Sequence, residues 1–183
     1  MRILLDADGV LVDWSKAASR LMGVDDSDPV IRAKLKSAKD VVGIIGAWED
    51  IYKVIDKAGE SFWMGLEKFP WADSLVGALQ GLDCQVAITT SVGKWAAGAS
   101  AKHKYFAKAY PGLPLIITKA KEFCAGPTSL LIDDLSDNLK KFEAAGGLIY
   151  HWPNQYKLLD QDESVVKAID DIEKIVRTVK KML

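Results

Sequence analysis

The sequence has few cysteines and no long hydrophobic run. Cys84 and Cys124 are the two cysteines among 183 residues, and each lies beside apolar residues, which favours reduced thiols over the disulfide framework of a small secreted domain. No uninterrupted apolar segment reaches the roughly 20 residues that cross a bilayer, and no signal peptide precedes the first apolar run. We therefore expect a cytoplasmic protein that makes no contact with a membrane.

An excess of charge of either sign is also missing. The 24 basic and 25 acidic side chains give a net charge of -1, which provides no general attraction to polyanions. This balance disfavours extended nucleic acid as a partner. The two histidines, His103 and His151, lack the spacing of metal ligands, and we expect surface or structural roles for them.

Short apolar runs alternate with helical patterns along most of the chain. Five runs have the length and β-branched content of buried parallel strands, and they lie at residues 3–5, 85–89, 115–118, 130–132 and 148–150. Helical patterns lie at residues 72–82, 96–110 and 136–145, and Gly146-Gly147 is a typical helix stop. The alternation predicts an α/β fold with a Rossmann-like, doubly wound parallel sheet.

The interval between the first and second apolar runs is too long for a simple crossover. Roughly 70 residues separate these two runs, whereas a single helix normally joins neighbouring parallel strands. Helical patterns at residues 14–35 and 40–59 occupy this interval. We therefore predict a small helical cap, residues 14–72, inserted after the first strand of a core that comprises residues 1–13 and 73–183.

The most informative motif follows the first apolar run. Asp6 and Asp8 are one residue apart at the end of a strand, so alternation directs both side chains to the same side, and Gly9 allows a sharp turn. Two carboxylates this close repel each other unless a cation lies between them or one holds a proton. An EF-hand loop does not explain the motif, because the glycine is fourth from Asp6 instead of sixth. The motif suits magnesium and phosphate.

Polar residues at the ends of later runs complement this motif. Thr90-Ser91 supplies hydroxyls and amides that could hold phosphate oxygens, Lys121 could neutralise a phosphoryl group, and Asp133-Asp134 could complete a magnesium site. Taken singly, the threonine could be an ordinary strand end, and the aspartates could cap the next helix. Because the carboxyl ends of parallel strands share one edge of a sheet, we expect these residues to converge.

Together, the motifs resemble those of the haloacid dehalogenase (HAD) superfamily of phosphohydrolases. The resemblance is carried by Asp6-Ala7-Asp8-Gly9-Val10, by Thr90, by a lysine that follows it, and by Leu131-Ile132-Asp133-Asp134. Segments 8–14, 62–70, 90–91 and 130–134 are more closely similar to the 5'(3')-deoxyribonucleotidases, of the cytosolic and mitochondrial type, and their phage and bacterial relatives.

The resemblance implies a role for each of these residues. Asp6 would attack phosphorus and form an aspartyl phosphate, while Asp8 would act first as general acid and then as general base. Thr90 and the motif lysine would stabilise the phosphoryl oxygens. The expected Mg²⁺ ligands are Asp6, Asp8 through its backbone carbonyl, Asp133 and Asp134. Which aspartate of the last pair binds the ion directly is open.

The motif lysine has three candidates in the sequence. Lys121 is our choice, because it begins the loop that leads into the Asp133 strand. Lys119 and Lys104 remain alternatives. Lys94 is expected to face the substrate instead.

The predicted cap is rich in aromatic residues, and most of them are expected to form its core. They are Trp14, Trp48, Phe62, Trp63, Phe69 and Trp71. Trp14 is the exception, because it directly follows Asp13, where the deoxyribonucleotidases place an aromatic residue that stacks on the base. The resemblance implies that Trp14 binds the substrate, with Phe62, Trp63 and Ser91 as further candidates.

We therefore predict a magnesium-dependent phosphomonoesterase that removes the 5'-phosphate of a (deoxy)ribonucleoside monophosphate. Its partner is a small molecule, and a homodimer is compatible with the sequence. The alternatives are a phosphatase for another small metabolite or for 3'-phosphate ends of nucleic acid, and a non-catalytic module that binds an ion or a nucleotide. A closed aromatic pocket would favour the mononucleotide, whereas a basic groove would favour nucleic acid ends.

Overall fold

The computed structural model describes residues 1–24, 43, 48–93, 96–153, 158 and 162–182. Within these residues, a five-stranded sheet has the order β3-β2-β1-β4-β5, and all neighbouring strands are parallel. The strands are β1 (Arg2–Asp6), β2 (Gln85–Thr90), β3 (Leu115–Ile117), β4 (Ser129–Asp133) and β5 (Leu148–His151). The predicted α/β class and parallel sheet are confirmed.

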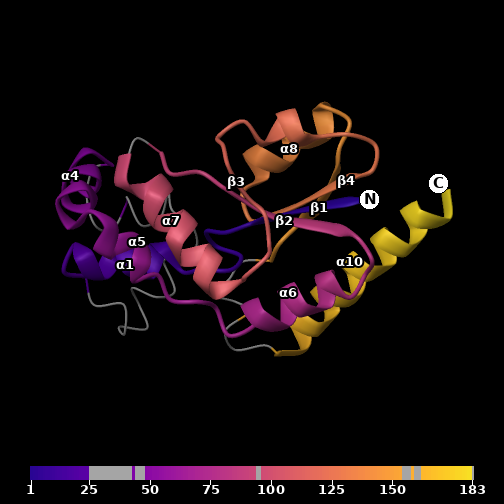
Figure 1. Ribbon diagram of the computed structural model, residues 1–183, viewed down its shortest axis with the longest axis horizontal. Helices are drawn as coiled ribbons and strands as arrows, with labels where there is room; N and C mark the ends of the chain where they lie inside the picture. Colours follow the sequence, from indigo (N-terminus) through magenta and orange to yellow (C-terminus); the bar gives the residue numbers. More distant parts are fainter. Residues whose placement is uncertain (25–42, 44–47, 94–95, 154–157, 159–161, 183) are drawn as a thin grey trace.

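Helices cover both faces of the sheet. In Figure 1, α8 (Ser136–Ala144) lies above the strands, while α6 (Ala72–Gln80) and α10 (Asp162–Met182) lie below them. A further helix, α7 (Ala96–Ala109), contributes Phe106 to the same buried cluster as α6 and α10. The sheet is therefore doubly wound, as predicted.

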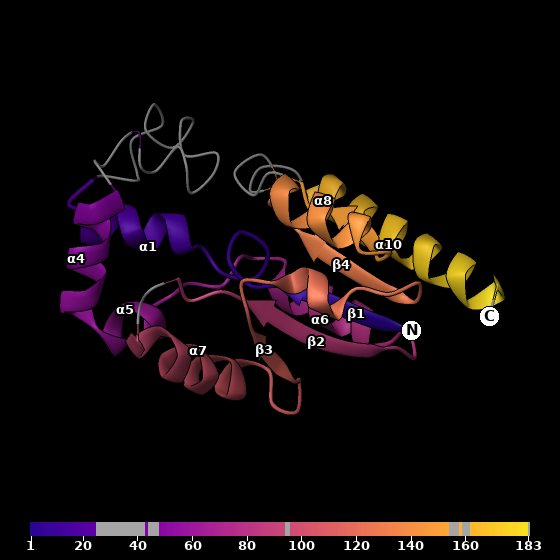
Figure 2. The ribbon, with the colours of Figure 1, turned by 90° about the horizontal axis from the view of Figure 1, so that it is seen from above.

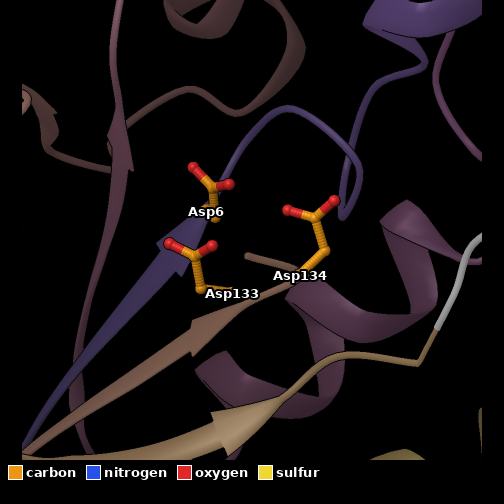
Figure 3. Close-up of side chains that lie close together, drawn as sticks. All are labelled: Asp6, Asp133 and Asp134. Atoms are coloured by element: carbon orange, nitrogen blue, oxygen red, sulfur yellow. The ribbon is translucent and has the colours of Figure 1, made fainter. Parts of the chain in front are cut away.

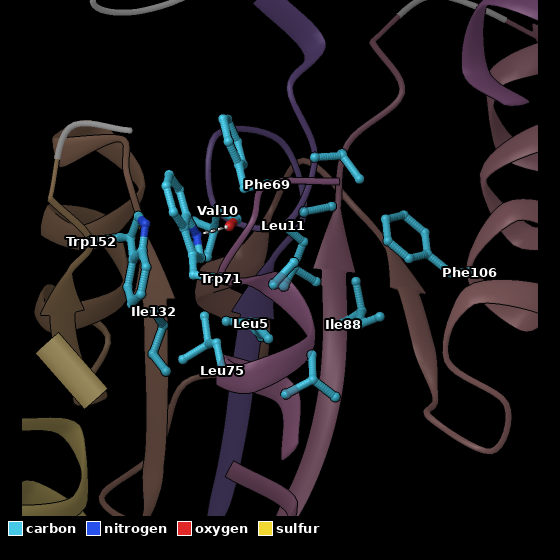
Figure 4. Close-up of a cluster of buried hydrophobic side chains, with 14 of the residues drawn as sticks. Leu5, Val10, Leu11, Phe69, Trp71, Leu75, Ile88, Phe106, Ile132 and Trp152 are labelled. Carbon is cyan, nitrogen blue, oxygen red and sulfur yellow. Dashed lines mark hydrogen bonds between the residues drawn. The ribbon is translucent and has the colours of Figure 1, made fainter. Parts of the chain in front are cut away.

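Alternation along β1 explains why both faces need a cover. Ile3 and Leu5 are fully buried in the larger hydrophobic cluster, in which Figure 4 labels Leu5, whereas Leu4 belongs to a smaller cluster with Leu139 and Phe142 of α8. Successive strand residues point to opposite faces, so a strand that is apolar at every position must be covered on both sides. The motif at the end of β1 is thus anchored in the centre of the fold.

Three helices of the described residues fill the interval between β1 and α6, and they gather beyond the carboxyl ends of the strands (Figure 2). They are α1 (Trp14–Leu21), α4 (Trp48–Ala58) and α5 (Glu60–Met64). The predicted helices at 14–35 and 40–59 are described only in part, because residues 25–42 and 44–47 lie outside the described residues. The separation of a cap from a core stays a prediction.

The chain returns from these helices along the loop that follows β1. The backbone N–H of Phe69 donates to the carbonyl of Leu11 at 2.9 Å. The indole Nε1 of Trp71 donates to the carbonyl of Val10 at 2.9 Å, and its ring lies 6.2 Å from that of Trp152 (Figure 4). Because a buried carbonyl needs a hydrogen-bond partner, these contacts fix the course of the loop.

Gly9 lets this loop turn where the sequence predicts a sharp turn. Its φ is +85°, a conformation that glycine adopts without steric cost. A Cβ at this position would lie 2.3 Å from Oδ2 of Asp134, closer than real contacts allow. The backbone N–H of Leu11 then donates back to the carbonyl of Ala7 at 2.8 Å. The tight loop brings the backbone of Gly9 against Asp134, which follows β4.

Two further features of the chain agree with the composition. Cys84 and Cys124 are free, as expected, and both are half-buried. The last helix, α10, packs into the larger hydrophobic cluster through Val165, Ile172 and Val176. None of the described helices combines the length and the apolar character that a bilayer crossing requires.

Candidate active site

Three carboxylates meet at the carboxyl edge of the sheet, as Figure 3 shows. Asp6 is the last residue of β1, Asp133 is the last residue of the neighbouring strand β4, and Asp134 follows it. One carboxylate oxygen from each lies within 4.8 Å of the others. The parallel pairing of β1 with β4 thus brings two distant motifs to one point.

Lys121, the first residue of a short 3-10 helix, η1 (Lys121–Cys124), bridges two of these carboxylates. Its Nζ lies 2.6 Å from Oδ1 of Asp6 and 2.6 Å from Oδ2 of Asp133. Burial alone would lower the pKa of Lys121, but the attraction of Asp6 and Asp133 outweighs it and raises the pKa above its ordinary value. Lys121 is therefore a permanent cation at the carboxylates.

The other two candidate lysines lie elsewhere. Nζ of Lys104 forms an exposed ion pair with Glu60 at 2.7 Å. Lys119 lines the same cavity as Lys121, but no ion pair joins it to the three carboxylates in the part of the chain that the structure describes. The geometry favours Lys121 as the motif lysine.

The site carries more negative charge than Lys121 neutralises. Burial raises the pKa of Asp6 to about 7, and the nearby charge of Asp133 adds to this shift. Burial also raises the pKa of Asp134 well above its ordinary value, with further contributions from Asp6 and Asp133. A divalent cation would compensate this excess of negative charge, so the oxygen atoms of the three carboxylates fit a site for such an ion.

The hydrogen bonds separate the roles of the two adjacent aspartates. Both oxygens of Asp133 are occupied: they accept from Lys121, from the backbone N–H of Leu135 at 2.8 Å, and from Nδ2 of Asn138 at 3.0 and 3.2 Å. By contrast, Oδ1 of Asp134 is buried and has no hydrogen-bond partner among the described residues. Asp134 is thus the aspartate with an oxygen available to a metal ion, while Asp133 holds Lys121.

Asp8 lies apart from the three-carboxylate group. Its Oδ2 accepts a hydrogen bond from Nζ of Lys102 at 2.5 Å, while its Oδ1 is buried without a hydrogen-bond partner in the described part of the chain. The same Nζ donates to Oγ1 of Thr90 at 2.7 Å. The carboxylate of Asp8 is therefore not one of the clustered metal donors, which leaves its backbone carbonyl as the expected contact to the ion.

Sequence reasoning missed Lys102. This lysine is fully buried, although lysine is almost never fully buried unless it is paired. The available signal was its position in the 96–109 helix, because residues at spacings of four, Gly98 and Phe106, share its buried face. An otherwise apolar helix face with one lysine indicates an acidic partner in the core.

A cavity of about 330 Å³ lies directly beside these residues. Its charged lining comprises Asp6, Asp8, Asp134, Lys119 and Lys121. A volume of this size is typical of sites for small ligands. Asp6, Asp8 and Lys121 therefore line a space in which a small phosphate ester could bind, whereas Thr90 is fully buried behind this lining.

Aromatic side chains line the same cavity. Trp14 and Trp63 are among them, as is Ser91, and all three were predicted to bind the substrate. Tyr52 of α4 also lines the cavity, although the sequence analysis did not single it out. Lys94 lies outside the described residues.

The prediction for Phe62 needs a correction, because the structure does not bring it to this cavity. Its ring lies edge-on to that of Trp14, with 6.2 Å between the centroids, and it borders a separate cavity. Phe62 and Trp63 are consecutive residues of α5, so their side chains point about 100° apart around the helix axis. Trp63 faces the carboxylates, and Phe62 therefore cannot.

The raised pKa values predict how magnesium stabilises the protein as the pH changes. Asp6, with a folded pKa of about 7, and Asp134 bind more protons in the folded than in the unfolded chain between about pH 4 and pH 7. The free energy of unfolding of the metal-free protein therefore falls as the pH rises through this window. Magnesium binds the ionised carboxylates, so the rise in Tm on adding it should grow between pH 5 and pH 7.5.

Differential scanning calorimetry with and without magnesium, at several pH values, tests this expectation. Asp134→Asn is the matched variant, because it removes one of the two raised pKa values and one donor, and it should reduce the magnesium-induced rise. A rise that stays constant with pH would contradict the expectation.

The comparisons with known proteins agree on the class of fold. The model of the family described as 5' nucleotidase, deoxy (pyrimidine), cytosolic type C matches residues 1–182. No curated protein sequence matches the chain. A hydrolase from Streptococcus pneumoniae has 15% identity and a TM-score of 0.54, with 87% of this chain and 97% of that chain covered.

Two other solved structures are similar to the same extent. The HAD hydrolase YfnB from Bacillus subtilis, bound to magnesium, has 17% identity and a TM-score of 0.53, with 81% of this chain and 84% of that chain covered. A HAD family hydrolase from Deinococcus radiodurans, with bound phosphate and sodium, has 14% identity and a TM-score of 0.50, with coverage of 82% and 79%. These likenesses show the fold.

Proposed function

Because the chain belongs to the family of cytosolic type C deoxy (pyrimidine) 5' nucleotidases, we propose that it removes the 5'-phosphate of a nucleoside monophosphate in a magnesium-dependent reaction. The family and the fold make it a HAD-superfamily phosphohydrolase, so the non-catalytic binding module is set aside. One observation carries the proposal: Asp6, held by Lys121 beside Asp134, faces a cavity with aromatic walls.

The first step transfers the phosphoryl group to the protein. A carboxylate oxygen of Asp6 attacks phosphorus, the bond from phosphorus to the sugar oxygen breaks, and Asp8 donates a proton to that leaving oxygen. Lys121 offsets the negative charge that accumulates around Asp6, and the hydroxyl of Thr90 donates to a phosphoryl oxygen. A divalent cation bound to Asp6, Asp134 and the Asp8 carbonyl would neutralise further charge of the phosphate.

The second step releases phosphate. A water molecule attacks phosphorus of the aspartyl phosphate, and the bond from phosphorus to the Asp6 oxygen breaks. Asp8, deprotonated after the first step, accepts the proton of this water. The carboxylate of Asp6 and the proton on Asp8 are thereby restored, so the cycle balances.

The cavity lining supports a mononucleotide as the substrate. Trp14, Tyr52 and Trp63 provide aromatic surface near the carboxylates, and base stacking on such side chains contributes about 1 to 3 kcal/mol. Lys119 and Lys121 are the cationic residues of this lining among the described residues. A strand of nucleic acid needs a basic groove that follows its backbone, so this lining favours the mononucleotide over a 3'-phosphate end.

A phosphate-release screen tests the proposal. It compares deoxyribonucleoside and ribonucleoside 5'-monophosphates, sugar phosphates and a 3'-phosphorylated oligonucleotide, each with and without magnesium. We expect the fastest turnover with a nucleoside 5'-monophosphate and magnesium. Preferential turnover of a sugar phosphate would assign the enzyme to another small metabolite, and turnover of the oligonucleotide would assign it to nucleic acid ends.

Trp14→Leu should raise KM for a nucleoside 5'-monophosphate by about 10- to 100-fold, because it removes a stacking surface. Its KM for deoxyribose 5-phosphate, which has no base, should change little. Steady-state kinetics with both substrates measure the difference. Phe62→Leu is the matched control: this ring packs on Trp14 but does not line the cavity, so its effect should be smaller. Equal increases for both substrates would argue against base stacking on Trp14.

The cytosolic type of the matched family supports a cytoplasmic location. The homodimer stays a prediction, and light scattering of the purified protein tests it.

A further inference from the structure

Lys102 is the one fully buried lysine of the described residues, and the steps above do not use it. It lies in α7, and its Nζ reaches residues from two strand ends. The acceptors are Oδ2 of Asp8 at 2.5 Å, Oγ1 of Thr90 at 2.7 Å and the backbone carbonyl of Ser91 at 3.3 Å. The same atom lies 5.1 Å from the centre of the Trp63 ring.

These contacts leave Lys102 no donor for a phosphate group. A lysine ammonium has three N–H donors, and the three oxygen acceptors account for all of them. Lys102 also does not line the cavity that Lys121 lines. It therefore acts on the substrate only through the side chains it binds.

The hydrogen bonds of Lys102 determine which atoms of its partners are left to bind another group. Because Lys102 occupies Oδ2 of Asp8, the other oxygen, the buried Oδ1, is the one without a partner among the described residues, and Asp8 lines the cavity. Oγ1 of Thr90 accepts from Lys102, so the proton of this hydroxyl is available to another acceptor. Asp8 thus offers one defined oxygen, and Thr90 is turned into a donor.

The surroundings hold the Lys102 ammonium in place. Trp63 of α5 covers it, and Gly98, one turn earlier in α7, allows this close packing. A Cβ at Gly98 would lie 3.1 Å from Cε2 of Trp63 and 3.0 Å from Cβ of Val92. Because a buried cation is costly unless its partners are fixed, the packing and the three acceptors stabilise one position.

We propose that Lys102 is a positioning residue that orients the Asp8 carboxylate toward the leaving oxygen and turns the Thr90 hydroxyl toward the phosphoryl group. This inference rests on the proposed phosphatase function and assigns a residue to it. Asp8 matters most when the leaving group is a poor one, because a sugar alkoxide needs a proton and a nitrophenolate does not. Loss of Lys102 should therefore lower the rate of the first step by different factors for substrates with different leaving groups.

The test compares Lys102→Met with the unchanged protein on a deoxyribonucleoside 5'-monophosphate and on p-nitrophenyl phosphate. General acid catalysis contributes about 10²- to 10⁴-fold, so we expect the rate of the first step, measured in a single turnover, to fall by about 100-fold or more for the nucleotide. For p-nitrophenyl phosphate the fall in this first-step rate should be at least tenfold smaller, since its leaving group needs no proton and only the contribution through Thr90 is lost. The second step, in which Asp8 accepts the proton of water, is the same for both substrates and does not enter the comparison. Asp8→Asn should show the same difference between the two substrates. The double variant, which combines Lys102→Met with Asp8→Asn, should lose little more activity than Asp8→Asn alone.

Lys104→Met is the matched control, since it removes a lysine of the same helix that forms an exposed ion pair. It should leave both activities unchanged. Thermal unfolding monitored by circular dichroism shows whether each variant folds. If Lys102→Met does not fold, Lys102→Gln, which keeps an amide donor but not the charge, should show a weaker form of the same difference between the two substrates.

The outcomes separate this inference from the proposed function. If the unchanged protein releases no phosphate from either substrate, the phosphatase function is wrong. If it is active but the first-step rate of a folded Lys102 variant falls equally with both substrates, or does not fall, the positioning role is wrong. A rise in KM at constant kcat would likewise overturn the role, because it would make Lys102 a phosphate-binding residue.

Discussion

Asp6→Asn should abolish turnover while the protein remains folded. An amide cannot form the aspartyl phosphate, and removing a nucleophile lowers kcat by on the order of 10⁴-fold or more in other covalent enzymes. The fold should survive because burial and the charge of Asp133 disfavour the ionised form of Asp6. A neutral side chain of similar shape removes this unfavourable charge and can still accept a hydrogen bond from Lys121.

Phosphate release and thermal unfolding together measure this result. Acid-quenched protein, mixed briefly with substrate and weighed by mass spectrometry, should carry one phosphoryl group in the unchanged protein and none in Asp6→Asn. Asp137→Asn is the matched control, because Asp137 lies at the exposed start of α8 near the same edge of the sheet. Turnover by Asp6→Asn close to that of this control would rule out attack by Asp6.

Lys121→Met should reduce both stability and activity. The side chain of Lys121 is 5% exposed and bridges two carboxylates that are 7% and 0% exposed. Removing one partner of a buried ion pair costs about 3 to 5 kcal/mol, because uncompensated charge stays behind. We expect a loss of this size in the free energy of unfolding without magnesium, and a smaller loss with magnesium, since the ion offsets part of the repulsion.

Urea denaturation with and without magnesium measures the stability effect, and phosphate release measures the loss of activity. Lys104→Met is again the control, and it should change the free energy of unfolding by less than about 1 kcal/mol, as is usual for exposed pairs. If Lys121→Met were as stable as this control in the absence of magnesium, Lys121 would not be the cation that the buried carboxylates require.

The sequence by itself determined the fold class and the principal acidic residues. The apolar runs predict all five strands within a few residues, because burial on both faces leaves a short, nearly continuous apolar segment. Asp6 and Asp133 end paired strands, so the rule that ligands bind at the carboxyl edge of a parallel sheet already predicts their meeting.

Only the tertiary structure decided which partners these residues have. Lys102 lies 94 residues from Asp8 and Lys121 lies 115 residues from Asp6, distances over which sequence spacing carries no information on contact. The assignment of the expected metal ligand within the Asp133-Asp134 pair depends in part on Asn138, whose amide donates to both oxygens of Asp133.

The aromatic residues that line the cavity also show what the sequence determines and what only the tertiary structure decides. The composition of residues 14–72 indicates an aromatic cluster but not which rings face the substrate. The rotation of α5 directs Trp63 to the cavity and Phe62 away from it, while α4 brings Tyr52 to the cavity. Helical rotation is set by packing against neighbouring elements, so a residue's direction is a property of the assembled fold and not of its local sequence.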